Sequence, residues 1–138
     1  MAEGQGVVYN NFKTQLFKKT VDMDSDTLKA VLVTAYIPDI DSHTVYADIS
    51  GDEVSGGGYT AGGATLANPV VSQDDANNRG KFVGDNITWT NLNAGTPSHL
   101  ILRDTTFDCL IAYWEITTAS TGANYLVKWN ADGITTSS

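Results

Sequence analysis

The sequence is short of the residues that most often build reactive sites. Its 138 residues include one cysteine, Cys109, and two histidines, His43 and His99. A single cysteine excludes a disulfide framework, and the apolar run around Cys109 predicts a buried thiol. Neither histidine has a cysteine, a carboxylate or the other histidine at ligand spacing, which argues against a metal or catalytic role. Because no nucleophile, base and acid set is recognisable either, we expect no catalytic residues and no cofactor.

Positive charge is also scarce. Eight lysines and arginines stand against 16 aspartates and glutamates, which gives a formal net charge of −8 and a pI near 4.4. A protein that binds nucleic acid through its phosphates needs a basic face, so we expect no nucleic-acid partner. An acidic surface can still meet a basic protein, or keep a crowded assembly soluble.

Long hydrophobic runs are missing as well. No apolar stretch of the sequence approaches the ~20 residues that cross a bilayer. The first ten residues lack a basic region followed by an apolar segment, so no secretory signal is recognisable. We therefore expect no membrane partner, and a protein that is made in a cytoplasm.

What the sequence has in abundance is residues that favour strands and turns. It contains 17 threonines, 11 valines and 13 aspartates, against only 3 glutamates. Threonine and valine fit a pleated surface, and aspartate prefers caps and turns to helix interiors. Hydrophobic residues make up 41% of the chain, enough to predict a single folded domain with its own core.

Periodicity predicts one helix followed by about seven to nine short strands. Phe12, Leu16 and Phe17 are expected on one face of a short amphipathic helix. The strands that follow are typical of a mainly β protein, a β-sandwich of jelly-roll or Greek-key type. The expected organisation is an extended N-terminal arm (1–9), the helix (10–21) and the β-sandwich (27–138).

Alternating aspartates follow the predicted helix, in Asp22-Met23-Asp24-Ser25-Asp26. Their spacing resembles the start of an EF-hand calcium loop. That motif requires glycine at its sixth position and glutamate at its twelfth, where Thr27 and Val33 stand. The segment therefore favours a solvated, capping turn over a calcium site.

A glycine-rich stretch, residues 53–66, is the most unusual part of the chain. Five of the 13 glycines fall between Gly56 and Gly63. Glycine accepts positive φ, so such a run can fold tightly over a neighbour. A phosphate-binding P-loop is excluded in practice, because Ala64-Thr65 stands where that loop has Lys-Ser/Thr and no strand directly precedes it.

Three side chains are expected to fix the glycine-rich stretch in place, namely Val54, Tyr59 and Leu66. The stretch then forms a shaped connection that leads into a strand near Leu66. It is expected to pack on the protein's own sandwich or on a neighbouring subunit.

Several blocks of sequence carry a family resemblance. The most specific is Glu53-Val54-Ser55-Gly56 followed by Gly58-Tyr59-Thr60-Ala61-Gly62-Gly63-Ala64-Thr65-Leu66. Matching segments extend from Tyr9-Asn10-Asn11-Phe12-Lys13 to Trp129-Asn130-Ala131-Asp132-Gly133-Ile134. With these blocks the chain resembles a family of small virion proteins of tailed bacteriophages. Residues 91–107 depart most, since relatives often carry a strand of Thr-Ala-Arg type there.

The resemblance implies a structural component of the phage particle, present in many copies. Within that family we expect a head decoration or cement protein on the outer capsid surface, which binds and stabilises the shell of major capsid protein and assembles into a symmetric oligomer. A tail component, such as a tail-tip or fibre-associated subunit, would use the same features. The residues expected to take part in contacts are Tyr9, Phe12, Val54, Tyr59 and Leu66.

A carbohydrate-binding module is a further alternative. It would need exposed aromatic side chains, and the candidates are Tyr46, Tyr59, Trp89 and Trp114. These residues fall in strand patterns that more often fill a core, which makes this function the weaker interpretation.

Overall fold

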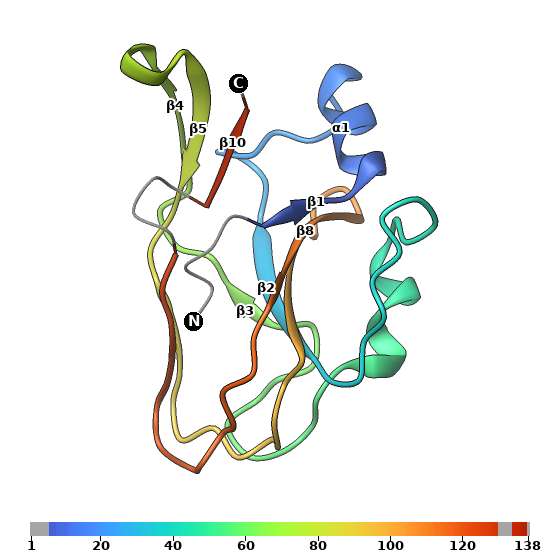
Figure 1. The fold of residues 1–138 in the computed structure, drawn as a ribbon, viewed down its shortest axis with the longest axis vertical. Helices are drawn as coiled ribbons and strands as arrows, with labels where there is room; N and C mark the ends of the chain where they lie inside the picture. Colours follow the sequence, from blue (N-terminus) through green and yellow to red (C-terminus); the bar gives the residue numbers. More distant parts are fainter. Residues whose placement is uncertain (1–5, 130–133, 138) are drawn as a thin grey trace.

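The protein is mainly β, with several antiparallel sheets and a single α-helix in the part of the chain that can be described (Figure 1). The structure, a computed structural model, describes residues 6–129 and 134–137. The strands are β1 (Val7–Val8), β2 (Leu28–Val33), β3 (Ala64–Thr65), β4 (Val70–Asp74), β5 (Arg79–Val83), β6 (Ile87–Trp89), β7 (His99–Asp104), β8 (Cys109–Glu115), β9 (Tyr125–Val127) and β10 (Thr135–Ser137). The helix is α1 (Asn10–Phe17), and short 3₁₀ turns span Tyr46–Asp48, Ser50–Asp52 and Asp75–Asn77.

The largest sheet has five strands in the order β1-β8-β7-β2-β3, and all its neighbours are antiparallel. In its centre β2 and β7 pair along their whole length, from Leu28 opposite Asp104 to Val33 opposite His99. The near-continuous apolar run from Leu28 predicts a strand inside a sheet, and this is confirmed, because β2 lies between β7 and β3.

Both faces of the five-stranded sheet are covered by hydrophobic residues. Alternate side chains of β2 point to opposite faces, so Ala30 and Leu32 join one cluster while Val31 and Val33 join another. The first cluster includes residues of β5, β6 and β9, such as Phe82, Trp89 and Val127. The second includes Tyr36, Ile40 and Ile49, which come from the segment between β2 and β3.

Two smaller sheets complete the fold, one in the order β10-β5-β4 and one formed by β6 and β9. Pro69 precedes β4 and predicts an edge strand or a bulge, because proline has no backbone N–H to donate. The first of these alternatives is confirmed, since β4 is the outer strand of its sheet. The β4–β5 hairpin stands at the same end of the molecule as α1 (Figure 1).

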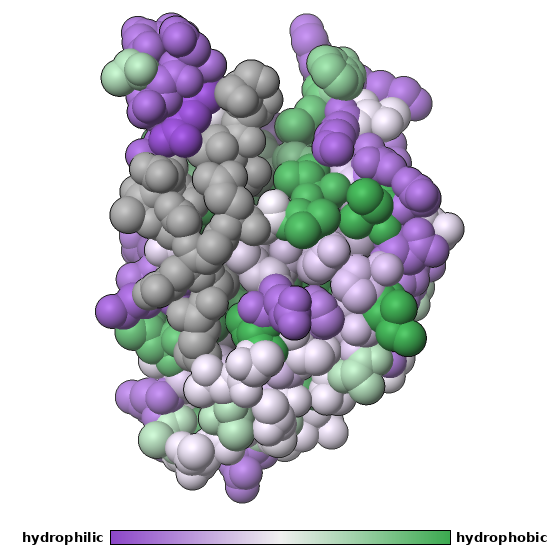
Figure 2. All heavy atoms as spheres, viewed as in Figure 1, coloured by the Kyte–Doolittle hydropathy of each residue, from purple (hydrophilic) through white to green (hydrophobic). Residues whose placement is uncertain are grey.

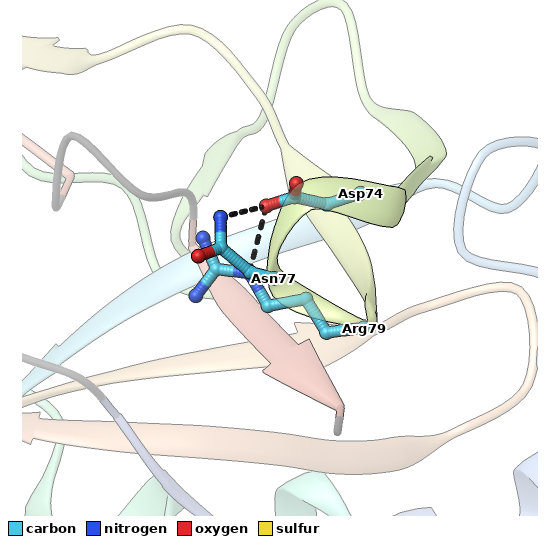
Figure 3. Close-up of polar contacts among 3 residues, drawn as sticks. All are labelled: Asp74, Asn77 and Arg79. Carbon is cyan, nitrogen blue, oxygen red and sulfur yellow. Dashed lines mark hydrogen bonds and ion pairs between the residues drawn. The ribbon is translucent and has the colours of Figure 1, made fainter.

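The tip of the β4–β5 hairpin is held by one carboxylate. Asp74 Oδ2 accepts hydrogen bonds from Asn77 Nδ2 and from Arg79 Nε, each at 2.9 Å (Figure 3). These contacts, that from Asn77 first, lower the pKa of Asp74. Asn78 adopts a left-handed conformation with φ of 53°, which asparagine tolerates better than most residues. The turn of the hairpin is therefore stabilised by side chains of the hairpin itself.

Helix α1 is shorter than its sequence predicts, ending at Phe17 instead of residue 21. Lys19 adopts a left-handed conformation with a φ of 60°. Thr20 N donates to Gln15 O and Lys19 N donates to Leu16 O, and these two hydrogen bonds form a Schellman motif. The expected shared face is also wrong. Phe12 is buried, whereas Phe17 lies five residues further along, on another side of the helix, and is 91% exposed. No helix among the described residues has the length and apolarity to span a bilayer.

The described part of the N-terminal segment, from Gly6 onward, packs on the five-stranded sheet. Val7–Val8 form β1, which pairs with β8 through Tyr113 and Ala112. Tyr9 follows with its backbone N donating to Ile111 O, and its side chain is fully buried. The valine pair suits a strand edge and the tyrosine fills the second cluster, so this part of the chain belongs to the body. Residues 1–5 of the expected arm lie outside the described residues.

Candidate interaction surface

A groove of about 800 Å³ runs between α1 and the β4–β5 hairpin. One wall comes from α1 and the turn after it, with Phe12, Leu16 and Met23 among the lining side chains, and the other comes from the hairpin, with Val71 and Phe82. Figure 2 shows the molecule hollowed at this end, between the hairpin and the helix. The groove is a concave surface of described residues that carries several apolar side chains.

Several side chains along this groove are hydrophobic and exposed. Phe17 is 91% exposed, Val71 is 49% exposed and Leu16 is 43% exposed. Single exposed hydrophobic residues are ordinary, but a group of them beside a groove is typical of a surface that binds another molecule. We take this groove as the candidate interaction surface.

The glycine-rich stretch lies inside the protein's own structure. Gly57 forms an isolated antiparallel bridge with Asn93, in which Asn93 N donates to Gly57 O at 2.7 Å. Three glycines leave no room for a side chain, because an added Cβ would lie 2.1 Å from Asn93 O at Gly56, 2.6 Å from Thr90 O at Gly58 and 2.2 Å from Ala30 O at Gly63. The stretch therefore packs closely on the loop after β6 and on β2.

A half-buried carboxylate, Glu53, organises the inside of this stretch. It accepts hydrogen bonds from the hydroxyls of Tyr46 and Tyr59, and from Gly62 N at 2.8 Å. The guanidinium of Arg103 lies 4.0 Å over the Tyr46 ring and donates to Gly62 O. Burial, followed by the Glu53 contact, raises the pKa of Tyr59 above its ordinary value, so this phenol stays protonated and can donate.

Removing the Tyr59 hydroxyl tests this arrangement. Tyr59→Phe keeps the ring, which stacks on Trp89, but removes one of the three hydrogen bonds to Glu53 and the acceptor of Leu32 N. We expect the free energy of unfolding to fall by about 1–2 kcal/mol. Urea unfolding of both proteins measures the loss. Ser50→Ala, which removes only an exposed hydroxyl, serves as the control, and equal stability of Tyr59→Phe and the natural protein would contradict the role assigned to Glu53.

The predicted contact residues are mostly core residues in the structure. Tyr9, Phe12, Val54 and Leu66 are buried, and Tyr59 is half-buried against the main cluster. Val54 N donates to Leu32 O and Leu66 N to Leu28 O, which anchors both ends of the glycine-rich stretch on β2. Phe12 is the member that also lines the groove. A direct contact of these side chains with a partner stays a prediction.

The histidines and the cysteine have ordinary surroundings. Tyr36 OH bonds both Tyr9 OH, at 2.7 Å, and His43 Nδ1, at 2.8 Å, and the His99 ring packs against Tyr36. The buried thiol predicted for Cys109 is confirmed, and burial raises its pKa to about 11. Among residues 6–129 and 134–137 no three histidine, cysteine or carboxylate side chains are grouped so that they could hold a metal ion.

The alternating aspartates form the turn predicted from their spacing. Asp26 N donates to Asp22 O at 2.8 Å, and Asp22 N donates to Asp26 Oδ2 at 3.0 Å. The carboxylate of Asp26 thus serves as a turn acceptor between α1 and β2.

A buried aspartate, Asp104, was missed by the sequence analysis. It is fully buried at the end of β7, and its Oδ1 accepts hydrogen bonds from Thr106 N and Phe107 N. The Asp26 carboxyl lies close to that of Asp104, and Asp104 Oδ2 receives no hydrogen bond from a described donor. Burial, and then the contact with Asp26, raise its pKa to about 7. The sequence places Asp104 two residues before the backbone N–H of a turn residue, a spacing that predicts an acceptor for that N–H. The spacing does not indicate that Asp26 lies nearby.

The groove itself was also missed, because its walls come from segments about sixty residues apart in the sequence. The aromatic candidates for a carbohydrate site lie inward, since Trp89 and Trp114 are buried and Tyr46 and Tyr59 contact Glu53. Comparison of the chain with protein-family models, with curated proteins and with solved structures found no match.

Proposed function

We propose that the protein is a structural component of tailed-bacteriophage particles, a decoration or cement protein that binds and stabilises the shell of major capsid protein. It is made in the host cytoplasm and ends on the outer capsid surface as part of a symmetric oligomer. The observation that supports this most directly is the groove, where Phe17, Leu16 and Val71 leave hydrophobic surface exposed on an otherwise acidic protein.

The β-sheets of the protein suit such a role because they form a rigid structure. A β-sandwich of jelly-roll or Greek-key type is the architecture proposed for it, supported by the hydrophobic cluster that joins the five-stranded sheet to β5, β6 and β9. The family-like glycine-rich stretch is bonded to β2 and to Asn93, which favours a structural role for it within that scaffold. A rigid body with one exposed apolar groove can bind a partner without first reordering.

Shells that lack the protein provide the test. Adding the purified protein is expected to raise the resistance of these shells to heat and to osmotic shock, because a ligand that binds only the intact shell stabilises it. Release of packaged DNA against temperature measures the effect, and sedimentation measures binding. Isolated tails are the control surface. Binding to tails with none to shells would contradict the cement role and identify a tail component instead.

A further inference from the structure

The groove differs in charge from the rest of the molecule. Its lining includes Lys13 and Lys19 on the α1 side, Lys81 on the hairpin side, and Asp22 and Asp24 at one end. The three lysines and two aspartates give the described part of the lining a net charge of +1, whereas the whole chain carries −8. Three of the chain's eight basic residues therefore surround one apolar groove.

These three lysines form no ion pair with a residue that the structure describes. The ion pair recorded among the described residues joins Arg79 to Asp74, and none of the groove lysines takes part in one. The two aspartates lie in the turn after α1, where contact with the Asp22 carboxyl raises the pKa of Asp24. Lysines on both walls, beside hydrophobic residues of the same lining, fit a partner that brings its own carboxylates.

Apolar side chains determine the other half of the fit. Phe17 stands almost fully exposed on α1, and Leu16 and Val71 are about half exposed on the two walls. Covering one such side chain by a partner contributes about tenfold or more in affinity. Since Leu16 and Phe17 lie on α1 and Val71 lies on β4, an elongated apolar segment can cover the three together, as amphipathic segments do in hydrophobic grooves.

We infer that the groove between α1 and the β4–β5 hairpin binds an apolar protein segment that carries acidic side chains. Its hydrophobic residues cover Phe17, Leu16 and Val71, and its carboxylates meet Lys13, Lys19 and Lys81. The source of the segment rests on the proposed function, under which it belongs to a subunit of the shell.

Two short synthetic peptides test the inference, with leucine alternating with glutamate in one and with lysine in the other. The net charge of the protein alone would favour the lysine peptide. We expect the opposite order in fluorescence anisotropy near physiological salt, with the glutamate peptide bound at least about tenfold more tightly. Tighter binding of the lysine peptide would overturn the inference.

Matched variants locate the binding. Phe17→Ser and Lys81→Glu are each expected to weaken the glutamate peptide by about tenfold. Ile37→Ser and Lys128→Glu make the same changes at exposed positions that do not line the groove, and are expected to alter affinity by less than about twofold. Circular dichroism checks that all four fold. Equal losses in the groove variants and their controls would overturn the assignment.

The same four variants separate this inference from the proposed function. If the natural protein binds shells and only Phe17→Ser and Lys81→Glu fail to bind, the groove is the face that meets the shell. If all four bind shells as well as the natural protein, the inference about the shell subunit is wrong and the proposed function stands. If the natural protein does not bind shells, the proposed function fails, and the peptides alone decide what the groove binds.

Discussion

Alanine at position 63 is expected to lower the free energy of unfolding by at least about 3 kcal/mol. Gly63 has a φ of +94°, and an added Cβ would lie 2.2 Å from Ala30 O and 2.7 Å from Ala30 C. The atoms in the way are backbone atoms of β2, inside the five-stranded sheet, and cannot move without disturbing its pairing. Because domains of this size are stable by only about 5–15 kcal/mol, the loss is a large share of the total.

Two other glycines separate the causes of that loss. Gly122 has a φ of +85° with no atom near an added Cβ, and Gly51 has open space without the positive φ. Gly122→Ala is expected to cost about 1 kcal/mol from backbone strain, and Gly51→Ala about 0.5 kcal/mol or less in either direction. Urea unfolding of the three variants gives the comparison. A Gly63→Ala protein as stable as Gly122→Ala would mean that the glycine-rich stretch is a loose spacer.

The second large effect is a gain in stability at alkaline pH when Asp104 becomes asparagine. Its neighbour Asp26 and its own burial raise the folded-state pKa of Asp104 from 3.8 to about 7. The folded protein therefore holds this proton more tightly than the unfolded chain does. Stability from this group is full below about pH 4, falls as pH rises, and is lost above about pH 7.

Asparagine resembles the protonated acid at every pH. Its oxygen can accept from Thr106 N and Phe107 N, as Asp104 Oδ1 does, and its NH₂ can donate to Asp26. We expect Asp104→Asn to match the natural protein at about pH 4 and to exceed it by about 2–4 kcal/mol at pH 8. Thermal unfolding across this range measures the difference. Asp52→Asn is the control variant, and parallel pH profiles of Asp104→Asn and the natural protein would contradict the raised pKa of Asp104.

Local sequence was enough to predict the elements that depend only on neighbouring residues. The apolar run from Leu28 predicts a strand inside a sheet, and Pro69 predicts an edge strand or a bulge after it, because each depends on neighbouring residues alone. Clustered glycines predict a tight connection for the same reason. The partners of that connection, Ala30 and the loop around Asn93, could not be predicted because nothing in the stretch encodes what lies beside it.

The parts that sequence did not predict depend on contacts between distant segments. Asp26 and Asp104 come from different turns, and only the pairing of β2 with β7 brings their carboxyls together. The groove likewise requires α1 to lie beside the β4–β5 hairpin. The length of α1 was misjudged because Lys19 takes the left-handed conformation that glycine or asparagine usually provides at a helix end.

The order of the strands bears on how the protein behaves at high concentration. The five-stranded sheet ends on both sides in strands of only two residues, β1 and β3, so each edge offers few free backbone groups to another chain. Short edges protect β proteins from joining edge to edge into aggregates. The longest edge among the described strands is β4, which follows Pro69 and exposes Val70 and Val71. Unwanted strand addition is therefore most favourable at β4, and a lysine on that strand is the simplest change that would discourage it.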